Sequence, residues 1–298
     1  MGLRPVAMHN AGARALILPT LACVSTAAEA HVGGGLSTPD LWLAASLAIA
    51  LLLYVWGARS LWHAASGHHR NLPRYAAPFA LGWLLLALAL LPPLASISAE
   101  TFSGHMLQHE VLMVAAAPLL VLGRPLAIWA WAFPRRWRPA LGRPARWQGV
   151  RAAWKFLTAP LTATVLHAVA LWLWHAPPLF AAAQGDIWVH ALQHAAFFFT
   201  ALLFWNAVFS ARDSATGASL FWLFVTMLHT GALGVLLTFS AGLWYPDAPG
   251  TAAWGLTPLE DQQLGGLIMW VPGGTVYVIA ALALAARWLG GGEPRRQS

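Results

Sequence analysis

Long apolar runs alternate with short polar or proline-rich connections over most of the chain. A helix rises about 1.5 Å per residue, so each run is long enough to cross the roughly 30 Å hydrocarbon core of a bilayer. Backbone groups in lipid must be hydrogen-bonded within their own segment, which predicts helices here. The predicted helices span residues 41–57, 76–95, 105–127, 157–176, 188–209, 219–241 and 264–288.

This pattern predicts an all-α fold, a polytopic membrane bundle of about seven transmembrane helices in one domain over residues 31–298. The composition agrees, because 59% of the residues are hydrophobic and only 9% are charged. A soluble domain carries about 25% charged residues. The 18 tryptophans fit aromatic belts at two membrane interfaces. We therefore expect no sizeable soluble domain.

Residues 1–30 have the pattern of a signal peptide. Arg4 and Arg14 supply a basic region, residues 15–24 a short apolar core, and Ala28-Glu29-Ala30 a cleavage site of small residues. Cleavage would leave His31 as the mature N-terminus, either as a copper-chelating residue or as part of a disordered end. The single cysteine, Cys23, lies in this segment, so the sequence predicts no disulfide and no thiolate metal site in the mature protein.

Basic residues gather in alternate connections between the predicted helices. The connections with Arg or Lys hold Arg59, Arg70, Arg74, Arg135, Arg136, Arg138, Arg143, Arg146, Arg151, Lys155, Arg212, Arg287, Arg295 and Arg296. The positive-inside rule then places the mature N-terminus outside and the C-terminus in the cytoplasm of a bacterial inner (plasma) membrane. The net charge of +7 is explained by this topology, and we expect no nucleic-acid partner. The basic, tryptophan-containing segment 134–155 is expected to lie along the anionic lipids of the inner leaflet.

Five histidines fall at the predicted outer ends of three helices: His105, His109, His175, His190 and His194. Two of these helices open with similar strings, His105-Met-Leu-Gln-His109 and His190-Ala-Leu-Gln-His194. A spacing of four residues places both imidazoles of a pair on one helix face. Neutral imidazole is a good ligand for copper, zinc and haem iron, so the pattern predicts a metal site. For any single histidine, a hydrogen bond to a neighbouring helix is the alternative.

Several other residues are candidates for supporting roles. Glu110 could orient an imidazole or could stabilise the first turn of its helix. Asp261 and Gln262 follow a predicted capping box of Thr257, Pro258 and Glu260, and capping does not explain them. Polar groups deeper in the bundle or soft ligands could form a metal path: His167, His229 and Met106.

The sequence resembles the CtaG family of cytochrome c oxidase assembly factors, the seven-helix type described from Bacillus. The motifs that carry the resemblance are His105-Met-Leu-Gln-His109 running to Gly123-Arg124-Pro125, Trp174-His175-x-Pro177, the His190–His194 string, and Leu259-Glu-Asp-Gln-Gln263 through Trp270-Val-Pro-Gly273. They occur in this order over residues 40–290.

The resemblance implies a membrane protein, not an enzyme, that is needed to form active haem-copper oxidase and is suspected to supply copper to it. Its implied partners are the oxidase subunits and membrane lipids, with periplasmic copper chaperones as further partners. The ligand assignment comes from the histidine spacing and not from the family. Two alternatives stay open: a b-type haem protein with one axial histidine from each of two helices, and a copper transporter that uses the deeper histidines.

Overall fold

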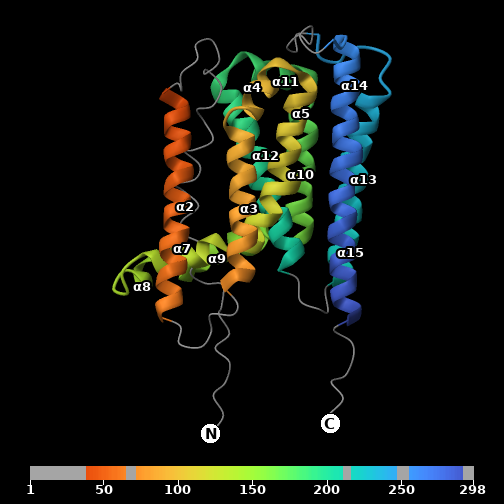
Figure 1. The fold of residues 1–298 in the computed structure, drawn as a ribbon. Helices are drawn as coiled ribbons and strands as arrows, with labels where there is room; N and C mark the ends of the chain where they lie inside the picture. The colour runs from red at the N-terminus through yellow and green to blue at the C-terminus, as the bar shows by residue number, and fades with distance from the viewer. Residues whose placement is uncertain (1–37, 65–71, 211–215, 247–254, 291–298) are drawn as a thin grey trace.

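A computed structural model describes residues 38–64, 72–210, 216–246 and 255–290. The described residues fold into an all-helical bundle (Figure 1). Among the described residues, six helical segments are long and apolar enough to span a membrane, and the bent pair 148–157 and 160–174 brings the number to seven when it is counted as one span. The predicted all-α membrane bundle is therefore confirmed. The proposed signal peptide, Cys23 and His31 lie outside the described residues.

The spans follow the predicted helices closely, with ends that differ by a few residues. They comprise α2 (Thr38–Ala64), α3 (Leu72–Leu90) with α4 (Leu94–Glu100), α5 (Phe102–Glu110) with η3 (Val111–Ala116) and α6 (Ala117–Gly123), α10 (Pro160–Trp174), α12 (Ile187–Phe209), α13 (Thr216–Thr238), and α14 (Pro258–Ile268) with η7 (Met269–Gly273) and α15 (Gly274–Gly290). The last span begins six residues earlier than predicted, because Thr257 and Glu260 form the complete capping box at its start.

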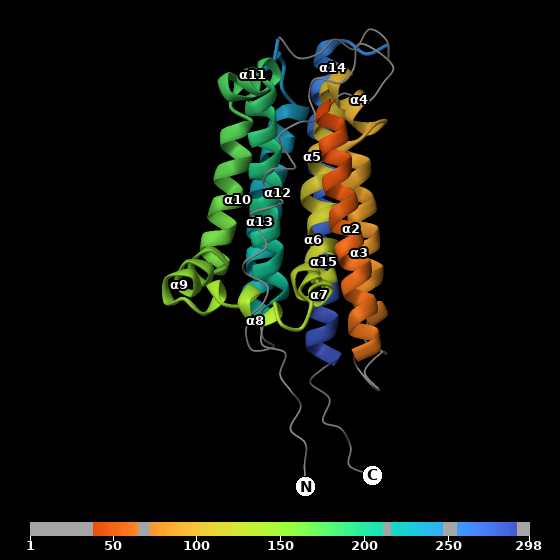
Figure 2. The same cartoon turned by 90° about the vertical axis from the view of Figure 1, so that its left-hand side faces the viewer.

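The connections contain short helices that the hydrophobic pattern did not predict. At one end of the bundle these are α7 (Pro125–Ala132), α8 (Arg138–Leu141), η4 (Pro144–Arg146) and α9 (Gln148–Leu157). At the opposite end α11 (Pro177–Gly185) forms such a connection, near α4 at the end of its span, as Figure 2 shows. The helix α9 meets α10 at a bend of 65°, so it leaves the direction of the bundle.

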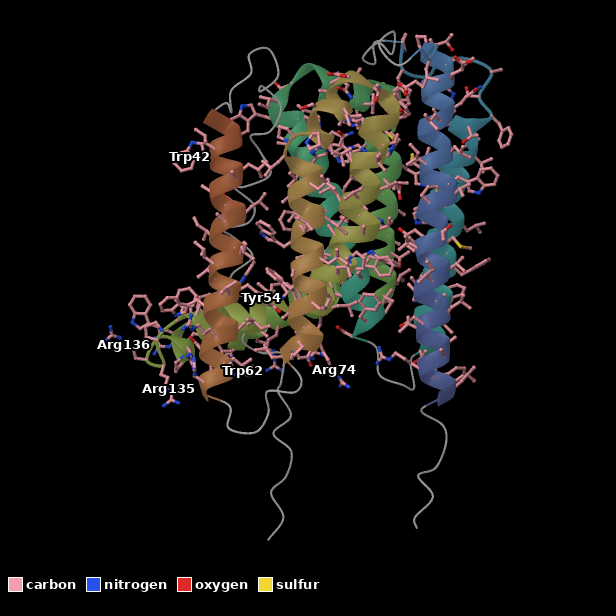
Figure 3. All side chains as sticks on the ribbon, in the orientation of Figure 1. Trp42, Tyr54, Trp62, Arg74, Arg135 and Arg136 are labelled. Carbon is pink, nitrogen blue, oxygen red and sulfur yellow. The ribbon has the colours of Figure 1, made fainter. Side chains whose placement is uncertain are left out.

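The two ends of the bundle differ in charge. Arg74, Arg135 and Arg136 lie at the end with α7 and α8, and Trp42 lies near the other (Figure 3). We call the first the basic end, and we call the end that carries α4, α11 and the start of α14 the histidine end. The separation agrees with the predicted sorting of basic connections, whereas the orientation in the membrane stays a prediction.

Small residues and a buried tyrosine hold the helices together. A Cβ atom on Gly266 of α14 would lie 2.6 Å from the carbonyl oxygen of Gly234 in α13, so these helices meet backbone to backbone. At the other side of the bundle, Tyr54 of α2 stacks on Phe79 of α3 with ring centroids 3.5 Å apart. The Tyr54 hydroxyl donates a hydrogen bond to the Gly123 carbonyl at 2.9 Å, which links α2 to α6.

Candidate metal centre

The five predicted histidines meet at the histidine end. His105 and His109 come from α5, His190 and His194 from α12, and His175 caps the C-terminus of α10. The ring centroids of His105 and His190 lie 5.2 Å apart, and those of His109 and His194 lie 5.1 Å apart. The centroid of His175 is 6.2 Å from that of His109. The helices α5 and α12 start at the same end of the bundle, and their paired imidazoles therefore meet at one depth.

Three of these rings have nitrogen atoms placed for a shared ion. One nitrogen each of His105, His109 and His194 lie within 4.8 Å of one another. The Nε2 atoms of His190 and His194 are 3.1 Å apart. Two imidazole nitrogens bound to one tetrahedral ion with bonds of about 2.0–2.1 Å lie roughly 3.3 Å apart. Small side-chain rotations would therefore bring these nitrogens to coordination distance.

A hydrogen-bond relay fixes the tautomer of His105. The Gln108 amide donates to the carbonyl oxygen of Ala89 at 2.7 Å, so its Oε1 atom faces Ser98. The Ser98 hydroxyl donates to this Oε1 at 2.5 Å. The Ser98 oxygen can then only accept from Nδ1–H of His105, which is 3.2 Å away. The proton of His105 is thereby held on Nδ1, and its Nε2 keeps a free lone pair.

His175 is fixed in the same tautomer by the backbone. Its Nδ1 lies 2.7 Å from the carbonyl oxygen of Leu171, which can only accept, so Nδ1 carries the proton. The hydroxyl of Tyr245 donates to the carbonyl oxygen of His175 at 2.7 Å. Burial raises the pKa of Tyr245, which keeps this hydroxyl a neutral donor. Both contacts hold the His175 ring with Nε2 available.

The available nitrogens are buried and have no hydrogen-bond partner among the described residues. They are Nε2 of His105, Nε2 of His175 and both ring nitrogens of His109. Phe180 packs against His105 and Phe197 against His109, with ring centroids 5.4 and 4.7 Å apart. Buried polar atoms are almost always paired, so these imidazole nitrogens are donors that a bound ion would satisfy. A soft or borderline transition-metal ion fits this donor set.

Residues at the start of α5 and α12 hold the histidine helices in place. The Thr101 side chain caps α5 by accepting from the Gly104 amide at 3.0 Å. The Asp261 carboxylate of α14 accepts from the amides of Phe102 and Ser103 at 2.6 and 3.1 Å. The Asp186 carboxylate caps α12 in the same way, through the amides of Trp188 and Val189.

The supporting residues expected from the sequence make contacts with α5, α14, η7 and the loop before α14. Asp261 binds the α5 backbone, and Gln262 accepts from the Trp244 amide at 2.7 Å in the loop before α14. Glu110 faces η7, where a Cβ on Gly273 would lie 2.5 Å from its Oε2. Met106 packs against Gly265 of α14. Asp261 and Gln262 thus accept from backbone amides, and Glu110 lies beside η7. A supporting role of these three residues at the imidazoles stays a prediction.

The deeper histidines form a separate polar cluster between α10 and α13. His167 and His229 lie on the neighbouring helices α10 and α13, and Nδ1 of His167 is 3.0 Å from the Thr200 hydroxyl of α12. His167 lies eight residues before His175, which is about 12 Å along a helix. The cluster is thus within the bundle and distinct from the histidine end.

Sequence reasoning missed Ser98 and Gln108. The sequence feature that could have pointed to Gln108 is the glutamine shared by the two histidine strings, since Gln108 and Gln193 directly precede His109 and His194. Gln193 is fully buried, and its side chain lies beside the ring of His105.

A family model described as cytochrome c oxidase caa3 assembly factor (Caa3_CtaG) matches residues 52–290. The matched range includes all five histidines, the relay residues Ser98 and Gln108, and Asp261. No curated protein and no solved structure matches the chain.

Proposed function

The chain belongs to the family of cytochrome c oxidase caa3 assembly factors, and from this membership we propose that its histidine end binds copper for insertion into haem-copper oxidase. The observation that carries the proposal is the set of buried, unpaired imidazole nitrogens of His105, His109 and His175 beside the His190–His194 pair. Copper is the cargo in this proposal, and the protein acts without catalytic turnover.

The difference in burial among the five histidines suits a copper ion that binds and is released again. His190 is only half-buried, whereas His105, His109, His175 and His194 are buried. An ion arriving at the surface would therefore meet His190 first and pass to its neighbour His194, whose Nε2 is 3.1 Å away. The fixed tautomers of His105 and His175 leave their Nε2 atoms ready without loss of a proton. Transfer to an oxidase subunit would use the same half-buried edge in reverse.

The close packing of the rings favours a single ion over a haem. Ring centroids of His105 and His109 are 4.2 Å apart, and those of His190 and His194 are 4.3 Å apart. The two pairs also contact each other, so the helices leave no slot for a porphyrin between them. A Soret band in the purified protein would favour the b-type haem alternative instead.

A second candidate function, copper movement across the membrane, is favoured by the cluster of His167 and His229. These residues end matching strings, Thr164-Val-Leu-His167 in α10 and Thr226-Met-Leu-His229 in α13. The hydroxyls of Thr164 and Thr226 and both ring nitrogens of His229 make no hydrogen bond within the described residues. Unpaired polar groups at this depth are costly and indicate water or a passing ion.

Metal analysis tests the principal function. The variant His105→Ala/His109→Ala/His190→Ala/His194→Ala should lose most bound copper after purification in detergent, and cells that carry it should contain oxidase with less copper. The matched control is His63→Ala, because His63 is exposed at the end of α2. Equal copper in the quadruple variant and the wild type would overturn the proposed site, whatever the oxidase activity.

A further inference from the structure

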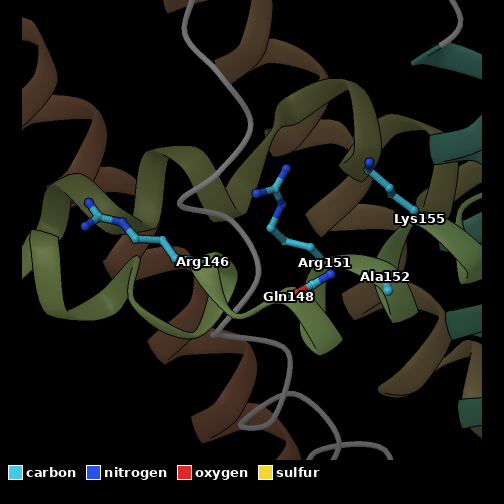
Figure 4. A pocket seen from close by; sticks show the side chains of 5 residues that line it. All are labelled: Arg146, Gln148, Arg151, Ala152 and Lys155. Carbon is cyan, nitrogen blue, oxygen red and sulfur yellow. The ribbon is translucent and has the colours of Figure 1, made fainter.

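A pocket of about 420 Å³ at the basic end is lined by three cations and lies apart from the histidines. Its lining residues are Arg146, Gln148, Arg151, Ala152 and Lys155 (Figure 4). Arg151 and Lys155 are one helical turn apart on α9 and extend to the same side of it, and Arg146 comes from the preceding turn η4.

The three cations of this pocket are not neutralised by the protein. Arg146, Arg151 and Lys155 are exposed and form no ion pair within the described residues. The chain contains no acidic residue from Val111 to Gly185, so no neighbour in this long segment can neutralise them. Three like charges gathered around one pocket repel each other and are stabilised by an anion.

The position of the pocket indicates where the anion comes from. The helix α9 turns 65° away from α10 at the basic end, and Figure 2 shows it beside the bundle. Two large apolar side chains flank the pocket residues, Trp147 and Phe156, and each is 66% exposed. A helix with basic residues and exposed aromatic residues at the end of a membrane bundle is suited to the boundary between headgroups and acyl chains.

We propose that Arg146, Arg151 and Lys155 bind the phosphate of an anionic phospholipid headgroup, while Trp147 and Phe156 contact its acyl chains. Arginine binds phosphate oxygens through two parallel N–H groups, and lysine adds a point charge. A free phosphate ion would satisfy the cations, but it would leave the two aromatic side chains without a partner. The lipid therefore explains both features of α9.

The test compares two triple variants that carry the same change in charge. Full-length protein is reconstituted with an equimolar mixture of phosphatidylglycerol and phosphatidylcholine, extracted in mild detergent, and analysed by native mass spectrometry. Each basic residue near an anionic surface strengthens the binding of an anionic lipid about fivefold. The variant Arg146→Gln/Arg151→Gln/Lys155→Gln should therefore weaken the preference for phosphatidylglycerol by about 100-fold. The control Arg59→Gln/Arg74→Gln/Arg287→Gln removes three cations elsewhere and should keep the preference.

Each other outcome overturns the proposal. An equal loss in both triple variants would show that the preference reflects total charge. A second outcome would show a free-anion site. In it, inorganic phosphate stabilises the wild type thermally but not the pocket variant, and the wild type shows no preference for phosphatidylglycerol. The single variant Arg151→Gln replaces the triple variant if the triple variant does not fold. It should weaken the preference for phosphatidylglycerol about fivefold, and an unchanged preference would overturn the proposal.

Discussion

Ser98 accepts a hydrogen bond from His105 because its own proton is already committed to Gln108. The Oγ of Ser98 lies 3.2 Å from Nδ1 of His105 and 2.5 Å from Oε1 of Gln108. Ser98 and His105 are seven positions apart in sequence, and the break between α4 and α5 brings them together. The lone pair that His105 offers to a metal thus depends on a serine in a different helix.

The first prediction concerns this serine. In Ser98→Ala the Nδ1–H of His105 loses its acceptor, so the ring can rotate or shift its proton to Nε2. Losing such an outer hydrogen bond typically costs about 10–100-fold in metal affinity. We expect that loss in the Cu(I) affinity of the purified variant, measured by competition with a chromogenic chelator. Ser98→Thr keeps the hydroxyl and should bind within a few-fold of wild type, and equal affinity in Ser98→Ala would refute the role of the relay.

The second prediction concerns the carboxylate that joins α14 to α5. In Asp261→Asn one oxygen becomes an NH₂ donor, which then faces the amide of Phe102 or Ser103. Loss of a helix cap costs about 0.5–2 kcal/mol, so the thermal midpoint should fall by several degrees. We also expect a lower copper affinity, because α5 carries His105 and His109.

Glu260→Gln is the matched control for Asp261→Asn. Glu260 lies one position earlier, in the exposed capping box of α14, and hydrogen-bonds Thr257 instead of α5. It should change the thermal midpoint little and leave copper affinity unchanged. If Glu260→Gln lowered copper affinity as much as Asp261→Asn, the effect would belong to α14 as a whole and not to the cap on α5.

These two roles show what the sequence could and could not predict. The helices follow from apolar runs, and the meeting of His105 with His190 follows from two similar strings at equal depth. The relay was not predictable, because Ser98 acts through the fold of a short helix that has no strong pattern of its own. The surroundings of Glu110 were not predictable from those of His109: adjacent residues on a helix point about 100° apart, and Glu110 lies beside Gly273 of η7 while His109 contacts His105 and His194. Asp261 was placed at the correct end, but its partner is the backbone.

The third prediction tests the close contact of α13 and α14. Gly266→Ala would place a methyl group 2.6 Å from the Gly234 carbonyl, so the two backbones must move apart. Such overpacking costs about 1–3 kcal/mol, and we expect a clear fall in the thermal midpoint. Gly274→Ala in the same span is the control, because a Cβ there meets no atom within 4 Å. It should be neutral or slightly stabilising, because alanine has the higher helix propensity. Equal destabilisation by both changes would show that the close contact of Gly266 with Gly234 is not what lowers the stability.

The fourth prediction separates delivery at the membrane surface from movement through the membrane. His229→Leu and Thr226→Val remove polar groups that have no partner within the described residues, so both changes should fold well or even stabilise the bundle. If copper is only handed over at the histidine end, cells with the double variant should assemble oxidase with normal copper content. If copper passes between α10 and α13, proteoliposomes of the double variant should take up copper at least about tenfold more slowly than wild type, while equilibrium binding at the histidine end stays the same.

The deciding measurement is uptake by sealed proteoliposomes containing an internal copper chelator, with His63→Ala as the control. Wild-type vesicles without uptake above empty ones would exclude the transport function and leave delivery at the surface.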